Sequence, residues 1–177
     1  MDFLDSLAFE IREINKANGW TSVEATDWSN NPYRIPAAIA LIHSEIVEAH
    51  DAYISASDFD EFMFELADVV IRVLDLAGGL TPAFGRQVLL AMDAPKEWTV
   101  GDTLLRLHKY TRLALEDFRH GRRELFLVNL AHLYRETVRL ATSDTFLQDG
   151  REFIRDFVIG KLAKNRNRGH RHGGKRV

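Results

Sequence analysis

Apolar residues recur at helical spacing along most of the chain. Phe3, Leu7, Ile11 and Ile14 share one face of an N-terminal helix, which Asn18-Gly19 would end. No segment alternates apolar and polar residues convincingly enough to predict a strand. The further expected helices span 37–56, 58–77, 82–92, 103–120, 122–142 and 149–166. Ser57 or Asp58 would cap the helix 58–77, and Gly78-Gly79 would end it. Asp102 would cap the helix 103–120, and Gly121 follows that helix. The pattern predicts an all-α fold.

Two of the expected hairpins are similar to each other. Residues 62–77 placed over 126–141, an offset of 64, give five identities in sixteen positions. The preceding helices align at an offset of 65, which pairs His43 with His108. We therefore predict a single domain, residues 1–177, whose four-helix-bundle-like core is built from two pseudo-repeated hairpins, with flanking helices and a basic C-terminal tail. The hairpins would cover 37–77 and 103–141; chance similarity between amphipathic hairpins is the alternative.

The composition is that of a soluble globular protein. The 177 residues are 46% hydrophobic and 28% charged, with no cysteine, which excludes disulfides, thiolate zinc sites and cysteine nucleophiles. No apolar run approaches the ~20 residues of a membrane helix. The acidic, amphipathic start of the chain differs from a signal peptide. We expect a cytoplasmic protein with no membrane contact.

The net charge of -3 hides an asymmetry along the chain. Residues 161–177 carry seven Lys or Arg and no acid, so the first 160 residues hold 16 basic and 26 acidic side chains, a net of -10. An acidic body with a basic tail suggests carboxylates for a cation and cations for an anion.

The first hairpin carries four acids that the second lacks. Two are three residues apart on one helix and two are three residues apart on the next, so each pair shares a helix face. The acids are Glu45, Glu48, Glu65 and Asp68, and the aligned positions of the second hairpin hold Tyr110, Leu113, Asn129 and His132. A true repeat would thus have one hairpin that kept the chemistry and one that became structural support.

Four converging carboxylates would repel one another unless a cation lay between them. Their oxygen ligands suit Mg²⁺, with Mn²⁺ as a second possibility. The stretch 64–71 is largely apolar around its two acids, where a charge without a partner is costly. Acids at a solvated helix edge are the alternative. A di-iron site is a weaker rival, because it expects a Glu-x-x-His on each of two helices, a spacing that this chain lacks.

At these acids the sequence resembles the all-α nucleoside triphosphate pyrophosphohydrolases, the MazG-like and dimeric dUTPase-like superfamily. Its Glu-x-x-Glu and Glu-x-x-Asp motifs correspond to residues 45–48 and 65–68. Residues 40–77 look especially like the MazG-like proteins common in phages, and the run from Lys161 is similar to their closing segment. The chain departs from the simplest relatives in the roughly 80 residues between Gly79 and Lys161. There the second hairpin resembles the tandem arrangement of dimeric dUTPase-like members.

The resemblance implies Mg²⁺-dependent hydrolysis of a nucleoside triphosphate, expected to be a dNTP, to the monophosphate and pyrophosphate. The four acids would be the metal ligands, with Glu45 and Glu48 catalytic and Glu48 as the base. A homodimer is the expected assembly. The alternatives are a regulatory nucleotide binder with slow turnover, and a non-catalytic helical module whose basic tail binds nucleic acid or nucleotide. Nucleic acid is the less favoured partner.

The basic tail supplies the expected phosphate contacts. Lys161 and Asn165 are four apart and share a helix face, and further cationic residues follow. Through the resemblance we interpret the tail as a clamp over the triphosphate rather than as a nucleic-acid arm. The remaining members of the clamp are Arg168, Arg171, His172 and Lys175.

Aromatic residues in the Ser/Asn-rich loop before the first acid helix are candidates for stacking on the nucleobase. They are Trp20, Trp28 and Tyr33, and Asn18 or Asn31 could contact the edge of the base. The histidine on the first acid helix, His43, is expected to pack or to support the site rather than to catalyse. Trp98 is expected in the core.

Overall fold

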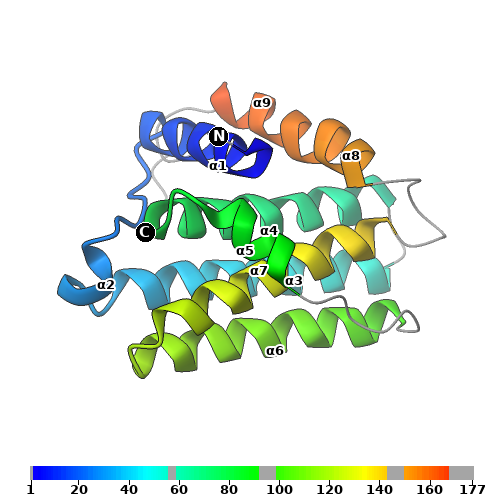
Figure 1. Cartoon of the computed structure of the whole chain (residues 1–177). Coiled ribbons are helices and arrows are strands. Elements are labelled where there is room, and N and C mark those ends of the chain that lie inside the picture. Colours follow the sequence, from blue (N-terminus) through cyan, green and yellow to red (C-terminus); the bar gives the residue numbers. More distant parts are fainter. Residues whose placement is uncertain (1, 56–58, 92–98, 143–149, 168–177) are drawn as a thin grey trace.

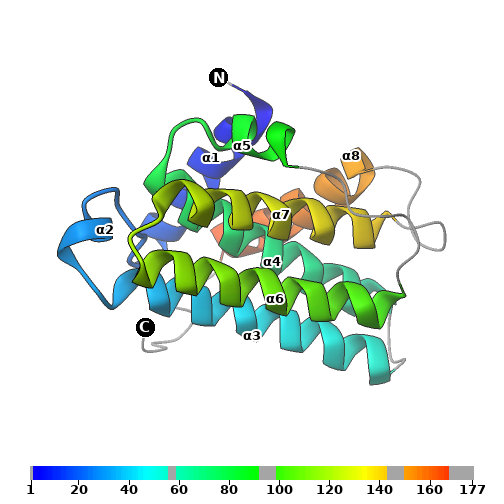
Figure 2. The same ribbon diagram turned by 60° about the horizontal axis from the view of Figure 1, so that its bottom comes forward.

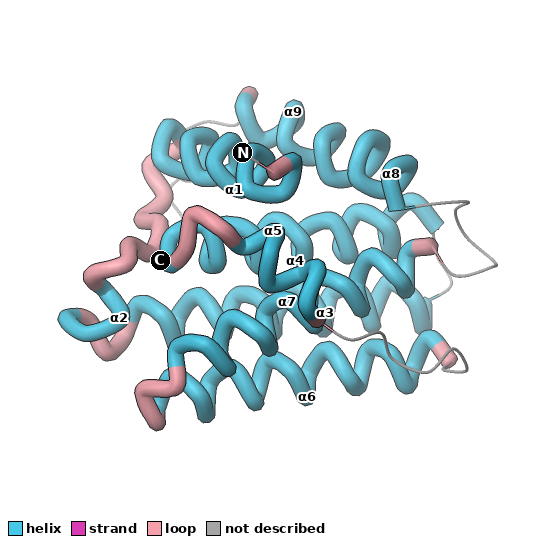
Figure 3. The backbone as a smooth tube through the Cα atoms, in the orientation of Figure 1, coloured by secondary structure: helices cyan, strands magenta, loops and turns pink. Residues whose placement is uncertain are grey.

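The computed structural model describes residues 2–55, 59–91, 99–142 and 150–167, and within these ranges it contains helices and no strand (Figures 1 and 3). This confirms the all-α prediction. The elements are α1 (Phe3–Ala17), α2 (Asp27–Asn30), α3 (Arg34–Ser55), α4 (Phe59–Leu80), α5 (Phe84–Leu90), α6 (Val100–Arg119), α7 (Arg123–Ala141), α8 (Gly150–Phe153), the π-helix η1 (Ile154–Ile159) and α9 (Gly160–Arg166).

Helix α4 lies at the centre of the molecule and contacts α1, α3, α7, η1 and α9. Its apolar positions cover most of its circumference, which is typical of a helix surrounded by others, and Met63, Leu66 and Val70 are fully buried. Figures 1 and 2 show α3, α4, α6 and α7 as a bundle. Helices α1 and α9 lie on the side of this bundle away from α6. Helix α4 of the predicted acid hairpin is therefore covered by α1 and α9.

Several helix boundaries differ from the sequence predictions, and α3 and α6 each begin three residues earlier than expected. Two residues predicted to mark helix ends also have other roles. Gly78-Gly79 does not end the third helix, because α4 continues to Leu80. A Cβ on Gly79 would lie 2.1 Å from the Val23 carbonyl oxygen, so this glycine permits close packing rather than a helix end. Asp102 is not the N-cap of α6: Thr99 is, and Asp102 completes a capping box with it.

The glycine predictions at the other two helix ends are confirmed. Gly19 and Gly121 have φ angles of 80° and 69°, the left-handed conformation that glycine adopts without strain. After α1, Trp20 N donates to Asn15 O, and after α6, Arg122 N donates to Asp117 O. Both ends are therefore Schellman motifs, which satisfy carbonyls of the last turn.

The arrangement of the hairpins supports the predicted repeat. Helix α3 packs on its counterpart α6, and α4 packs on its counterpart α7. The aligned pair His43 and His108 meet, with their Nδ1 atoms 3.0 Å apart. Equivalent residues meet where they lie on a two-fold axis, so this contact fits a pseudo-two-fold relation between the hairpins. The interpretation of His43 as a packing residue agrees with this position.

Two local features had no counterpart in the predictions. The short helix α2 interrupts the loop before α3, and η1 replaces the middle of the last predicted helix. None of the helices in the described ranges combines the length and apolar character that a bilayer-crossing segment requires.

Candidate metal and nucleotide site

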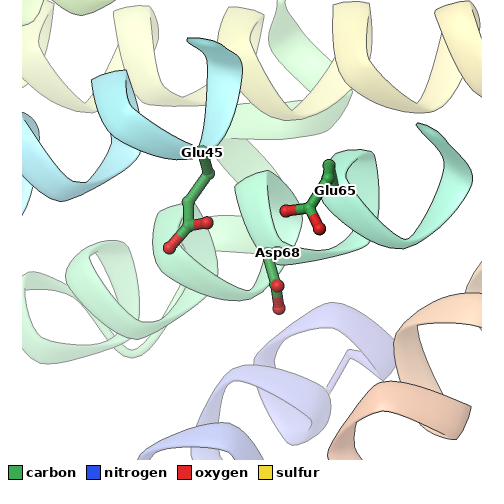
Figure 4. Close-up of side chains that lie close together, drawn as sticks. All are labelled: Glu45, Glu65 and Asp68. Atoms are coloured by element: carbon green, nitrogen blue, oxygen red, sulfur yellow. The ribbon is translucent and has the colours of Figure 1, made fainter. Parts of the chain in front are cut away.

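Three of the four predicted acids come together between α3 and α4. Glu45 reaches over from α3, and Glu65 and Asp68 lie side by side on α4 (Figure 4). One carboxylate oxygen from each lies within 4.8 Å of the other two. The three-residue spacing on α4 and the antiparallel packing of α3 and α4 bring them together. The acid group, as we call Glu45, Glu65 and Asp68, offers oxygen ligands only.

Burial and charge repulsion raise the pKa values of two members of the acid group, Glu45 and Glu65. Glu45 is only 8% exposed, and its desolvation raises its pKa, an effect that Arg72 opposes. Desolvation raises the pKa of Glu65 to about 7, with Asp68, Glu48 and Glu45 adding to the shift and Lys161 opposing it. Ionising Glu45 and Glu65 in this fold therefore costs free energy. A cation between them would remove part of this cost.

Glu48 lies outside the acid group. It is exposed on α3, and its Oε1 accepts a hydrogen bond of 3.2 Å from Ser44 Oγ. Its charge still contributes to the raised pKa values of Glu45 and Glu65, so it stands at the edge of the site. The structure thus gathers three of the predicted carboxylates, with the fourth beside them.

The closing segment meets the acid group through Lys161. Its Nζ lies 2.6 Å from Asp68 Oδ2, and both side chains are mostly buried, at 13% and 20% exposed. Asn165, one turn later, is buried; its backbone oxygen accepts from Asn18 Nδ2 at 2.8 Å. The side-chain oxygen of Asn165 has no hydrogen-bond partner among the described residues. The structure therefore joins Lys161 to the acids, whereas Asn165 packs beside α1.

The other predicted clamp residues cannot be placed. Arg168, Arg171, His172 and Lys175 lie outside the described residues, and so does Trp98.

A pocket of about 450 Å³ lies nearby, and none of the three acids lines it. Its wall includes Trp20, Asn31 and Tyr33 from the loop, as well as Arg72 and Asp75 from α4. Arg72 links the two sites, because its Nε donates to Glu45 Oε1 at 3.0 Å. The predicted stacking position of Trp20 thus lies one side chain away from the candidate metal ligands.

Trp28 is not among the residues that line this pocket. Its ring packs edge-on against Phe118 and Phe126, with centroid distances of 5.3 and 5.2 Å, and the guanidinium of Arg123 lies over it. The prediction that Trp28 contacts the base is therefore not supported by its position. Helix α2 places Trp28 against Phe118 of α6 and Phe126 of α7, where burial of its ring is favourable.

Sequence analysis overlooked Arg72 and Asp75. With Glu65 and Asp68 they form a polar stripe on α4 at spacings of 3, 4 and 3 residues, which is one face of a helix. This pattern is visible in the sequence, because these four residues are the only charged ones in α4 after its first turn.

The second hairpin fills the equivalent position with neutral and paired groups. Tyr110 and His132, the counterparts of Glu45 and Asp68, stack with centroids 4.9 Å apart. Glu136, the counterpart of Arg72, accepts from Arg106 at 3.3 Å and from Arg139 at 2.9 Å. A ring stack and buried ion pairs thus take the place of the acid group.

No known protein family, curated protein or solved structure matches the chain. The resemblance drawn from the two motifs therefore stays a prediction, and the functional argument depends on the site itself.

Proposed function

We propose that this protein hydrolyses a nucleoside triphosphate to the monophosphate and pyrophosphate with the help of Mg²⁺. The observation that carries the proposal is the acid group, whose three carboxylates offer oxygens within 4.8 Å of one another. Two further features support it: a cationic side chain, Lys161, in contact with Asp68, and a pocket with an aromatic wall whose lining residue Arg72 donates to Glu45.

The donor set fits a hard divalent cation. Glu45, Glu65 and Asp68 would hold Mg²⁺, which is bound by oxygen and usually keeps several waters. When bound, such an ion neutralises phosphate charge and lowers the pKa of a coordinated water. The pKa of about 7 at Glu65 agrees with this use, since a group of acids that repel one another gains from an added positive charge.

The protein's own residues have separable roles in this proposal. Lys161 pairs with Asp68, and its ammonium could exchange this carboxylate for a phosphate oxygen of the substrate. Arg72 holds the Glu45 carboxylate in place. Glu48, outside the acid group and exposed, is the acid we assign as the proton acceptor for the attacking water.

The test is direct. Incubation with Mg²⁺ and each canonical NTP and dNTP should release monophosphate and pyrophosphate, detected by chromatography, and chelation should stop the release. Asp68→Asn should abolish turnover, whereas the matched variant Asp51→Asn, on the exposed face of α3, should retain it. If none of the nucleotides is hydrolysed, the proposal is wrong. Turnover unaffected by Asp68→Asn would show that the reaction uses another site.

A further inference from the structure

The pocket linked to the acid group by Arg72 has a mixed wall, and Asp75 is its one acidic lining residue among those described. Trp20, Tyr33 and Leu41 supply flat or apolar surface, whereas Arg72 and Asp75 supply a donor and an acceptor. These two residues are three apart on α4 and therefore neighbours on one helix face. A ligand in this pocket would meet flat and apolar surface, further polar groups from Asn31 and Arg34, and on α4 a donor paired with an acceptor.

Asp75 is an unusual residue to find in such a wall. Only 19% of its side chain is exposed, and burial raises the pKa of its carboxyl, an effect that Arg12 opposes. Ser22 Oγ donates to Asp75 Oδ1 at 3.1 Å, and the Asn15 side chain also bonds the carboxylate. A carboxylate has about four acceptor positions, so roughly two remain for a ligand.

The distance between the two sites matches the length of a nucleoside. Asp68 of the acid group and Asp75 of the pocket are seven residues apart on α4, which corresponds to about 10 Å along the helix axis. Arg72 lies between them and contacts Glu45. A nucleotide with its phosphates at the acid group would therefore bring its base to Asp75.

We infer that this pocket is a guanine subsite, in which Asp75 accepts from the N1–H and N2–H₂ of the base and Arg72 donates to its O6. This inference rests on the proposed function, because it takes the ligand to be a nucleotide.

The hydrogen-bonding edge of each base gives the reason. Guanine is the one common base that presents two adjacent N–H donors, which a carboxylate can accept together. Adenine and cytosine present one amino group next to a ring acceptor, and uracil presents one N–H between two carbonyls. Each of these would place an acceptor beside the buried charge of Asp75, where it is repelled.

The first experiment measures binding without hydrolysis. Isothermal titration of the wild-type protein with GMP, AMP, CMP, UMP and IMP, in EDTA, should give the tightest binding for GMP, by roughly 10- to 100-fold. IMP differs from GMP only by the missing 2-amino group, so it should bind several-fold more weakly. Equal affinities, a preference for another base, or IMP binding as well as GMP would overturn the inference.

The second experiment exchanges the specificity. In Asp75→Asn one acceptor becomes an amide donor, which suits xanthine, whose 2-carbonyl replaces the guanine amino group. This variant should bind XMP more tightly than GMP, the reverse of the wild-type order, an effect that simple loss of structure would not produce. Glu24→Gln is the matched control, because Glu24 also pairs with Arg12 but does not line the pocket, and it should keep the wild-type order.

The two proposals fail separately. Hydrolysis of every nucleotide without base preference would overturn the guanine subsite and leave the reaction standing. Selective GMP binding without turnover of GTP or dGTP would overturn the reaction and leave the subsite standing. If Asp75→Asn does not fold, the comparison of GMP with IMP on the wild-type protein decides the question.

Discussion

Replacing Glu65 with glutamine should stabilise the metal-free protein above neutral pH. The pKa of this carboxyl is raised from 4.5 to about 7 in the fold, mainly by burial. Between these two values the folded state binds more protons than the unfolded state, so stability falls as the pH rises through this window and then levels off. Glutamine keeps the shape of the side chain and cannot ionise, so the variant should lack this loss.

The size of the effect follows from the shift. A change from 4.5 to about 7 corresponds to about 3 kcal/mol at full value. Glu65 is only partly buried, and solvent screening reduces such a shift, so we expect roughly 1–2 kcal/mol in the free energy of unfolding. This is a measurable share of the stability of a small domain.

Urea denaturation in EDTA, followed by circular dichroism at about pH 5 and pH 8, measures the difference. Glu65→Gln should gain stability over wild type mainly at the higher pH, whereas Asp51→Asn should show no such gain. Adding Mg²⁺ at pH 8 should stabilise the wild type more than the variant, because the wild type keeps the third carboxylate. A gap between wild type and variant that does not change with pH, or that shrinks as the pH rises, would refute the reasoning.

Four further substitutions test helix packing, a helix cap and the roles assigned to the two tryptophans. Gly79→Ala should lower the free energy of unfolding by roughly 2–3 kcal/mol, because its Cβ would lie 2.1 Å from the Val23 oxygen; an unchanged urea midpoint would contradict this. Thr99→Ala should lower the free energy of unfolding by about 1 kcal/mol, because α6 loses its N-cap. The nucleotide affinity of this variant should not change. Trp28→Ala should lower the free energy of unfolding by roughly 2–3 kcal/mol and leave the nucleotide affinity unchanged. Trp20→Ala should weaken nucleotide binding and leave the free energy of unfolding nearly unchanged. If Trp28→Ala weakened binding and Trp20→Ala lowered stability, the roles assigned to the two residues would be wrong.

Much of the fold could be predicted because helical periodicity is a local property of the chain. The apolar spacing indicated the long helices, and Gly19 and Gly121 marked two helix ends through a conformation that glycine adopts without strain. The same reasoning failed at Gly79, where a neighbouring loop rather than the local backbone requires glycine. It also missed η1, whose backbone pattern the local spacing did not reveal.

For the site, the sequence by itself determined which acids share a helix face, since a spacing of three residues does so in any helix. Only the tertiary structure decided that Glu45, Glu65 and Asp68 meet while Glu48 stays at the edge, because this depends on how α3 is rotated against α4. It also decided that Lys161 reaches Asp68 from the far end of the chain and that Arg72 joins the acids to the pocket of Trp20 and Asp75. Those contacts join segments that are distant in sequence, so packing brings them together and no local pattern reveals them.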